Sequence, residues 1–315
     1  MADPENRNEG WEKHLLEKLV LSSLQEQRRA RHWSVFFKSL AFIYLFVLLF
    51  YGLGWFGGSE MSIGKHTALV ELRGVISPDS VSSADNINAG LQHAFKDEKT
   101  RGVILRINSP GGSPVQAGYI NDEIRRLRAE YPQIPLYAVV EDICASGGYY
   151  VAAAADKIYV DKASVIGSIG VVMNGFGFTE AMEKLGIERR LITAGKNKGF
   201  LDPFSPPNAE QEKYAREMLG DVHQQFIQVV QQGRGKRLKE TPEIFSGIVW
   251  TGQKSIDLGL ADAIGSAEYV AREIIKAENI VDYTSREGFA ERFARRFGAV
   301  MADTLISAGA GWGLR

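Results

Sequence analysis

Residues 102–112 read GVILRINSPGG, and the pattern around this stretch predicts the architecture of the chain. The apolar and β-branched residues at its start are typical of a buried strand, and the turn that follows contains one proline and two glycines. Residues 113–130 then carry a helical pattern. A strand, a glycine-containing turn and a helix in this order make half of a βαβ unit.

The same alternation extends in both directions along the chain. The predicted strands are 67–72, 102–107, 136–140, 157–160, 169–173 and 189–192, and the predicted helices are 83–95, 113–130, 147–155, 179–185 and 208–232. In the last helix, apolar side chains recur at spacings of three and four, as on a helix that packs one face against a sheet: Tyr214, Met218, Val222, Phe226 and Val229. We therefore expect an α/β fold with a largely parallel sheet.

Composition excludes several classes of protein. The chain has 315 residues, 45% of them hydrophobic, and 37 Lys and Arg against 38 Asp and Glu give a net charge of −1. This balance is that of a globular protein, not of a disordered, collagen-like or coiled-coil chain, and it lacks the basic excess of a dedicated nucleic-acid-binding protein. A single cysteine, Cys144, excludes an internal disulfide, and no CxxC or HExxH pattern indicates a zinc site. We expect neither a metal nor another cofactor, and no nucleic acid as partner.

An uncharged stretch near the N-terminus predicts a membrane anchor. No side chain from Ser39 to Gly58 carries a charge, and about 20 residues at ~1.5 Å per residue cross a hydrocarbon core of about 30 Å. We predict a transmembrane helix at 34–57. Basic residues precede it and few charges follow, so the N-terminus is expected on the cytoplasmic side. A cleaved signal peptide is the rival interpretation, but its charged n-region would be unusually long and no A-x-A site follows.

Three glycine-containing turns follow predicted strands and are candidates for a site. They are Asn108-Ser109-Pro110-Gly111-Gly112, Ala145-Ser146-Gly147-Gly148-Tyr149-Tyr150 and Ile166-Gly167-Ser168-Ile169-Gly170. In α/β sheets, ligands bind at such strand ends. Ser146, at the start of a helix and beside two glycines, suits a nucleophile, and an N-cap serine is the structural alternative. Cys144 is expected to be a buried, small apolar side chain.

A nucleophilic serine needs a base, and the sequence offers two kinds. None of His66, His93 and His223 lies in a glycine-rich turn, so each is expected to be a surface or packing residue. A lysine is the alternative, provided that its pKa falls from about 10.4 toward neutrality. The loop 195–200 (GKNKGF), followed by apolar residues, is a candidate setting for it.

Taken together, these motifs resemble the signal peptide peptidase A family of serine proteases. The resemblance rests on the three turns quoted above, on Val249-Trp250-Thr251-Gly252 and on Asp257-Leu258-Gly259-Leu260-Ala261-Asp262, and it covers about residues 67–275. It implies a crotonase/Clp-protease-like fold and a Ser/Lys dyad. It also implies a membrane-anchored homo-oligomer.

The resemblance assigns roles to individual residues. It makes Ser146 the nucleophile, Lys198 the general base and Ser168 the residue that orients the lysine, with the backbone N–H groups of Gly112 and Gly147 as the oxyanion hole. The family loop normally reads Ser-Gly-x-x-Lys-Asp, whereas this chain has alanine at 194 and glycine at 199. These two departures keep Lys196 as a competitor for the role of base.

The function implied is a membrane-anchored serine endopeptidase that degrades released signal peptides or other membrane-proximal peptides. A related inner-membrane periplasmic protease is one alternative. The second is a crotonase-fold acyl-CoA enzyme, for which Glu141 and Asp142 are the acids near the site. The third is a scaffold protein with a degenerate protease fold.

The expected organisation has four parts. A cytoplasmic tail at 1–33 precedes the anchor at 34–57, and the protease domain spans 58–280 on the periplasmic side of a bacterial inner membrane. The tail at 281–315 repeats phenylalanine at i+4 spacing between arginines, at Phe289, Phe293 and Phe297. This pattern fits an amphipathic helix that contacts the membrane surface, another subunit or the domain itself, and a disordered end is expected from residue 308.

Overall fold

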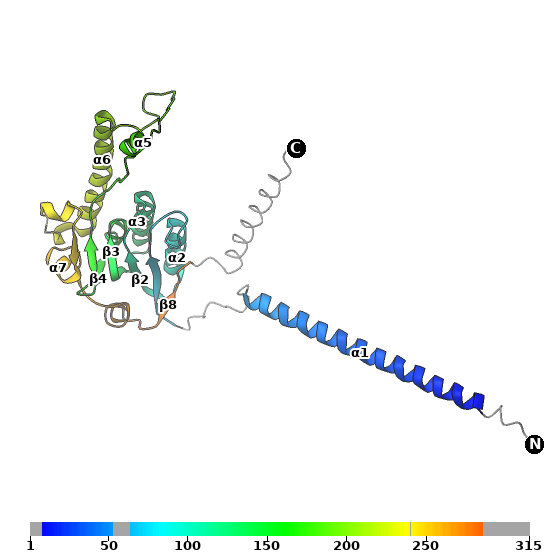
Figure 1. The fold of residues 1–315 in the computed structure, drawn as a ribbon. Coiled ribbons are helices and arrows are strands. Elements are labelled where there is room, and N and C mark those ends of the chain that lie inside the picture. Colours follow the sequence, from blue (N-terminus) through cyan, green and yellow to red (C-terminus); the bar gives the residue numbers. More distant parts are fainter. Residues whose placement is uncertain (1–7, 53–63, 240, 286–315) are drawn as a thin grey trace, which may run out of the picture. The chain divides into compact units, whose positions relative to one another are not determined.

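The computed structural model describes residues 8–52, 64–239 and 241–285, which fall into two separate parts. One part is the single helix α1 (Asn8–Gly52), and the other is an α/β domain. Figure 1 shows both. The predicted C-terminal helix with its three phenylalanines lies outside the described residues.

Helix α1 contains the predicted anchor. Its segment Gln27–Phe50 has a mean hydropathy of 2.0 and none of its most apolar stretch is buried, so it is long and apolar enough to cross a membrane. The predicted span 34–57 overlaps this segment, and its last residues, 53–57, lie outside the described part of the chain. Along the helix, Trp33 stacks on Phe37 with ring centroids 5.7 Å apart.

The domain is built on one mixed sheet, which confirms the predicted α/β fold. Its described strands are β1 (His66–Arg73), β2 (Thr100–Ser109), β3 (Leu136–Ala145), β4 (Lys157–Val160), β5 (Val165–Gly167), β6 (Val249–Thr251), β7 (Ala263–Ile264) and β8 (Ile280–Asp282). The main order is β6-β5-β3-β2-β1-β8; off this path, β4 pairs with β3 and β7 pairs with β4. All described pairs are parallel except β5–β6.

Three helices cover one face of the sheet and bury the main core. They are α2 (Ala84–Lys96), α3 (Pro114–Glu130) and α4 (Gly147–Ala152). The hydroxyl of Ser113 accepts from the amide of Gln116, and Pro114 occupies the first helical turn, so α3 begins directly after the glycine turn of β2. This start places the Gly111–Gly112 turn at the carboxyl end of the sheet.

The opposite face and the sheet edge carry shorter elements. Helix α8 (Ala267–Tyr269) and the π-helix Val270–Ile275 bury a smaller cluster against this face, which includes Leu69, Ile104, Val139 and Tyr159. Further short elements are the 3₁₀ helices Gly235–Arg237 and Pro242–Phe245 and helix α7 (Gly252–Asp257).

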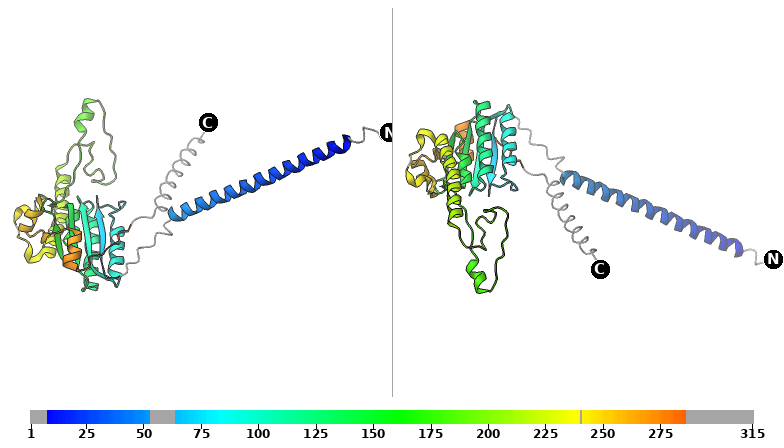
Figure 2. Two further views of the ribbon diagram at one scale, coloured as in Figure 1. Left: turned by 90° about the horizontal axis from the view of Figure 1, so that it is seen from below. Right: turned by 90° about the horizontal axis from the view of Figure 1, so that it is seen from above.

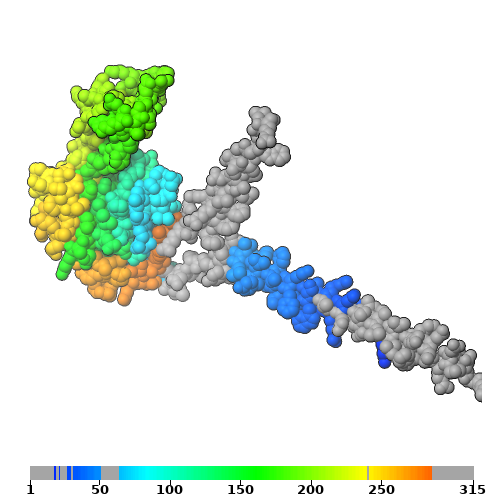
Figure 3. Space-filling model, in the orientation of Figure 1, coloured from blue at the N-terminus to red at the C-terminus, as the bar shows by residue number. Residues whose placement is uncertain are grey.

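Residues 171–207, called the arm below, project from the domain. The arm contains α5 (Thr179–Lys184), which has no buried residue, and it leads into the long helix α6 (Ala209–Arg234). Figure 2 shows the projection from two sides, and Figure 3 shows that it stands clear of the body of the domain. Its contacts lie within the arm, such as the stacked rings of Phe178 and Phe204, 5.5 Å apart, and with the first turns of α6, such as that of Phe200 with Tyr214.

Two predicted strands, 169–173 and 189–192, are wrong. Strand β5 ends at Gly167, and Ser168 has a φ of 52°, so the chain leaves the sheet before 169. The first segment contains three β-branched residues and the second ends in Leu191 and Ile192, but neither has a neighbouring strand, and Val172 and Ile192 are 83% and 95% exposed. β-propensity describes how well a side chain fits a half-buried sheet surface. Where the fold offers no such surface, a high β-propensity does not predict a strand.

Candidate active site

Ser146 lies in a strained turn between a strand and a helix. Strand β3 ends at Ala145 and α4 begins at Gly147, and Ser146 between them has a φ of 52° and a ψ of −124°. A non-glycine residue with such a φ costs about 1–3 kcal/mol and is typical of functional sites. Two hydrogen bonds hold the turn: the Ser146 amide donates to Gly167 O at 2.9 Å, and the Tyr150 amide donates to Ser146 O at 3.0 Å.

The Ser146 hydroxyl does not cap the helix that it precedes. Helix α4 has no side-chain hydrogen bond at its N-cap, and within the described residues nothing bonds to the Ser146 hydroxyl. The N-cap interpretation is therefore wrong, because a capping serine accepts from the second or third helical amide. The hydroxyl remains available for chemistry.

Two backbone amides lie beside Ser146 without acceptors. A Cβ atom built on Gly147 would be 3.2 Å from the amide nitrogen of Gly112, so the two glycines lie against each other. Around them, the Ile76 amide donates to Gly111 O at 2.9 Å and the Ser113 amide donates to Ile76 O at 2.8 Å. In the described part of the chain, no acceptor faces the N–H of Gly112 or Gly147. Free, fixed amides of this kind can hold a developing oxyanion.

Ser168 forms a second strained turn facing the first. Its φ is 52°, and its amide donates to Ile248 O at 2.9 Å, next to the β5–β6 pair. The neighbouring carbonyl of Ile169 lies 3.2 Å from His223 Nε2 on α6. His223 therefore packs behind this turn, as expected for a structural histidine.

A cleft of about 660 Å³ joins these turns. It is lined by Gly112, Pro114, Val115, Gly118, Tyr119, Asp122, Ser146, Gly147, Tyr150, Ser168, Gly170, Val171, Val172, Val222, Gln225, Phe226, Ser246 and Gly247. The structure thus brings together four of the five predicted site residues. The walls of the cleft that α3 and α6 form were not predicted as part of the site. An amphipathic pattern indicates that a helix packs on another element, but it does not identify the surface that the helix contacts.

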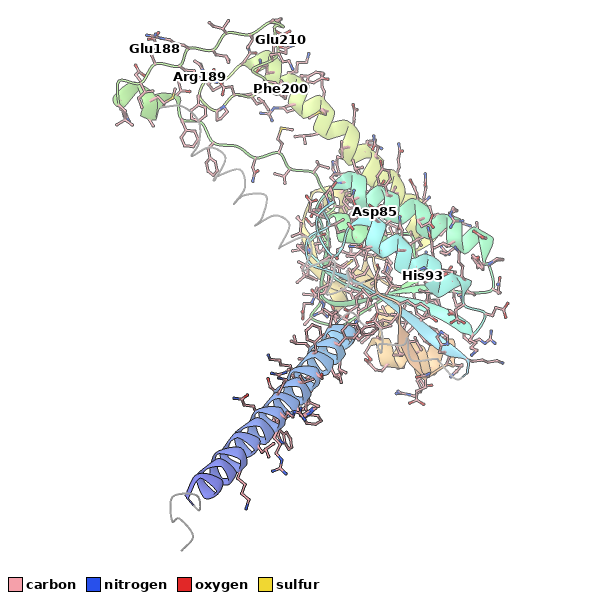
Figure 4. The ribbon with its side chains drawn as sticks, turned by 90° about the vertical axis from the view of Figure 1, so that its right-hand side faces the viewer. Asp85, His93, Glu188, Arg189, Phe200 and Glu210 are labelled. Atoms are coloured by element: carbon pink, nitrogen blue, oxygen red, sulfur yellow. The ribbon has the colours of Figure 1, made fainter. Side chains whose placement is uncertain are left out.

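The fifth predicted residue, Lys198, is not brought to this cleft. Lys198 and its competitor Lys196 lie on the arm, both exposed, and neither lines the cleft. Figure 4 shows Glu188 and Phe200 of the arm near Glu210 at the start of α6, away from α2 with Asp85 and His93.

The two lysines differ in their surroundings. Lys196 Nζ donates to Glu210 Oε2 at 2.9 Å, and this hydrogen bond and charge lower the pKa of Glu210. Pairing with a carboxylate stabilises a charged ammonium. Lys198 is held only through its backbone, whose amide donates to Gly195 O at 3.1 Å, and no acid of the described chain pairs with its side chain.

Other candidate groups lie away from the cleft. Cys144 is fully buried, and burial raises the pKa of its thiol well above the ordinary value, so it is the inert apolar residue that was expected. Glu141 pairs with Arg73 at 2.8 Å, and Asp142 accepts from Asn108 at 2.8 Å. Neither acid lines the cleft, which leaves the acyl-CoA interpretation without its two acids at Ser146.

Comparison with known proteins identifies the domain. Residues 128–281 match the model of peptidase family S49. Over 221 residues the chain is 32% identical to the chloroplastic serine protease SPPA of Arabidopsis thaliana, covering 68% of this chain and 32% of that one. Over 255 residues it is 28% identical to protease 4 of Haemophilus influenzae, covering 78% and 40%.

A further relative carries a different name. The Na(+)/H(+) antiporter NhaA of Brucella melitensis is 43% identical over 202 residues, covering 62% of this chain and 27% of that protein. The chain therefore spans about a quarter of the antiporter's length. The family match lies in the α/β domain with its Ser146 cleft, and the protein belongs to peptidase family S49.

Proposed function

We propose that this protein is a membrane-anchored serine endopeptidase with Ser146 as nucleophile and Lys198 as general base. One observation carries the proposal: the uncommitted hydroxyl of Ser146 opens into a cleft beside the free amides of Gly112 and Gly147. Nucleophile and oxyanion donors are the two parts that acyl transfer requires in fixed geometry.

The chemistry follows from these roles. Neutral Lys198 takes the proton of the Ser146 hydroxyl, whose oxygen attacks the peptide carbonyl, and the Gly112 and Gly147 amides hold the oxyanion. The tetrahedral intermediate collapses, and Lys198 gives the proton to the leaving amine. Lys198 then activates a water molecule that hydrolyses the acyl-enzyme.

The position of Lys198 supports a homo-oligomer as the active form. Since Lys198 is exposed on an arm that projects from its own domain, we propose that a second copy of the chain brings its lysine to the Ser146 cleft. The arm also exposes apolar side chains that a monomer leaves in water: Val172, Phe176, Leu185 and Ile192 are 83%, 81%, 73% and 95% exposed. Four large apolar side chains so exposed on one short segment support an interaction surface there.

The anchor suggests the substrates. We propose that the apolar segment within Gln27–Phe50 spans a bacterial inner membrane with the N-terminus in the cytoplasm, and that the domain lies on the outer side. In this position the domain meets released signal peptides and other membrane-proximal peptides, which are the substrates that we propose.

The test is cleavage of fluorogenic peptides by the full-length protein in detergent. We expect loss of turnover in Ser146→Ala and in Lys198→Ala, and retained turnover in Lys196→Ala. Co-expression of the Ser146→Ala and Lys198→Ala chains should restore part of the activity when the two residues come from different copies. Turnover that survives Ser146→Ala contradicts the mechanism, and turnover that survives Lys198→Ala contradicts the assignment of the base.

A further inference from the structure

The cleft beside Ser146 extends along helix α3. The helix begins at Pro114, next to the Gly112 turn, and both Pro114 and Asp122 line the cleft. They are eight residues apart, or about 12 Å along the axis at ~1.5 Å per residue. The cleft therefore runs from the nucleophile past two turns of α3, and Asp122 marks its far end.

The walls between these two ends carry apolar and aromatic side chains, together with the amide of Gln225 on α6. Val115 and Tyr119 of α3 face the cleft and are each 58% exposed, while Val222 and Phe226 contribute from α6. Gly118 lies between them on the same face of α3, and a Cβ atom there would have no neighbour within 4 Å. The missing side chain leaves the middle of the cleft open.

The far end carries an uncommitted negative charge. Within the described residues, Asp122 is exposed and neither a cation nor a hydrogen-bond donor pairs with its carboxylate. The ring of Tyr150 packs on Phe226 with centroids 5.2 Å apart, so this tyrosine forms the floor near Asp122.

At Tyr150 the negative charge of Asp122 has a larger effect than the positive charge of Arg125. Burial raises the pKa of Tyr150, the charge of Asp122 raises it further, and the opposing effect of Arg125 is smaller. Arg125 Nη1 donates to the neutral Gln232 Oε1 at 2.9 Å, while its buried Nη2 has no hydrogen-bond partner, so no acid of the described chain pairs with it.

From this arrangement we infer that the cleft is a specificity pocket for lysine or arginine on the acyl side of the cleaved bond, with Asp122 as the selecting residue. The inference rests on the proposed function and names its substrate class. A long amphipathic side chain buries its methylene stem between α3 and α6 and places its charged head at the carboxylate. A shorter apolar side chain fills the near part of the cleft but leaves Asp122 without a partner.

The test uses the full-length protein in detergent and peptides that differ only at that position, with lysine, arginine, leucine, alanine or glutamate. Wild type is expected to prefer lysine and arginine. In Asp122→Asn, kcat/KM for these two should fall about tenfold, as for loss of one partly buried ion pair, and stay within about twofold for leucine. Asp221→Asn, an exposed carboxylate on α6 outside the cleft lining, is the matched control and should leave all ratios unchanged.

Two further variants sharpen the result. Asp122→Lys should raise the rate with glutamate and lower it with lysine, because the charge at the far end is reversed. Gly118→Leu fills the middle of the cleft, so it should reduce cleavage after arginine and lysine while alanine is retained.

The outcomes separate this inference from the proposed function. Cleavage after leucine in preference to lysine and arginine, or an Asp122→Asn variant that lowers all peptides alike, overturns the pocket assignment while the peptidase stands. Failure of wild type and Ser146→Ala to differ on any peptide overturns both.

Discussion

The carbonyl oxygen of Ile76 faces Gly112 so closely that a Cβ atom on Gly112 would lie 2.1 Å from it. The same oxygen accepts from the Ser113 amide at 2.8 Å, and Gly112 has a φ of 151°. Only glycine fits this conformation and this space. The contact therefore fixes the turn that carries the free Gly112 amide beside Ser146.

Gly112→Ala should lower kcat by about 100-fold, because displacement of the turn removes an oxyanion donor from its position. The variant should still fold, since the change lies at the surface end of the sheet. Gly220→Ala is the control: it lies in the exposed middle of α6 with nothing near its Cβ position, and it should keep full activity and gain about 0.5–1 kcal/mol of stability. Equal kcat in the two variants contradicts a role for Gly112 in catalysis. Peptide turnover and urea unfolding provide the two measurements.

A buried ion pair fastens α6 to the rest of the domain. Arg234 is 1% exposed, and it donates to Asp262 Oδ2 at 2.9 Å and to Gly259 O at 2.8 Å. Arg234→Met should reduce the free energy of unfolding by about 3–5 kcal/mol, because Asp262 keeps a half-buried charge without its main partner. Urea denaturation of wild type and variant measures the difference. A loss below about 1 kcal/mol would show that Arg237, 3.1 Å from the same carboxylate, is a sufficient partner.

The same carboxylate makes stability depend on pH. Burial alone raises the pKa of Asp262, but the hydrogen bond and charge of Arg234, with the Ile158 amide and Arg237, outweigh burial and lower it. A depressed pKa stabilises the fold above the unfolded value of about 3.9, and this stability is lost as pH falls below that value. Urea midpoints between pH 5 and pH 3 should therefore fall more steeply in wild type than in Asp262→Asn. Parallel slopes would contradict this assignment, because other carboxylates contribute equally to both proteins.

Cys144 should not react with alkylating reagents in the folded protein. Its thiol is buried, and burial raises its pKa, so the reactive thiolate is not populated near neutral pH. Iodoacetamide at pH 8 should label the protein in urea but not under native conditions, and Cys144→Ala should turn over peptides within about threefold of wild type. Rapid native labelling with loss of activity would make Cys144 a rival to Ser146.

Much of the fold was predictable because its signals are local. Strand β2, the glycine turn and helix α3 follow one another in sequence, and Ser113 and Pro114 mark the start of the helix. The segments 169–173 and 189–192 have equally strong strand signals but no neighbouring strand, so the same reasoning failed there. Strands β6 to β8 have three residues or fewer each, which is too short for an alternating apolar pattern to predict them.

The sequence alone determined the order of strands and helices from β1 to β4, the apolar segment of α1 and the glycine turns that hold Ser146 and Ser168, since each depends on residues close together along the chain. Tertiary structure determined which side chains on these strands, helices and turns lie next to one another. It placed Asp122 and Phe226, 104 residues apart, in one cleft, it buried Arg234 against Asp262, and it set Lys198 on an arm away from Ser146. Such contacts depend on how helices and strands pack across long sequence separations, and no local pattern encodes them.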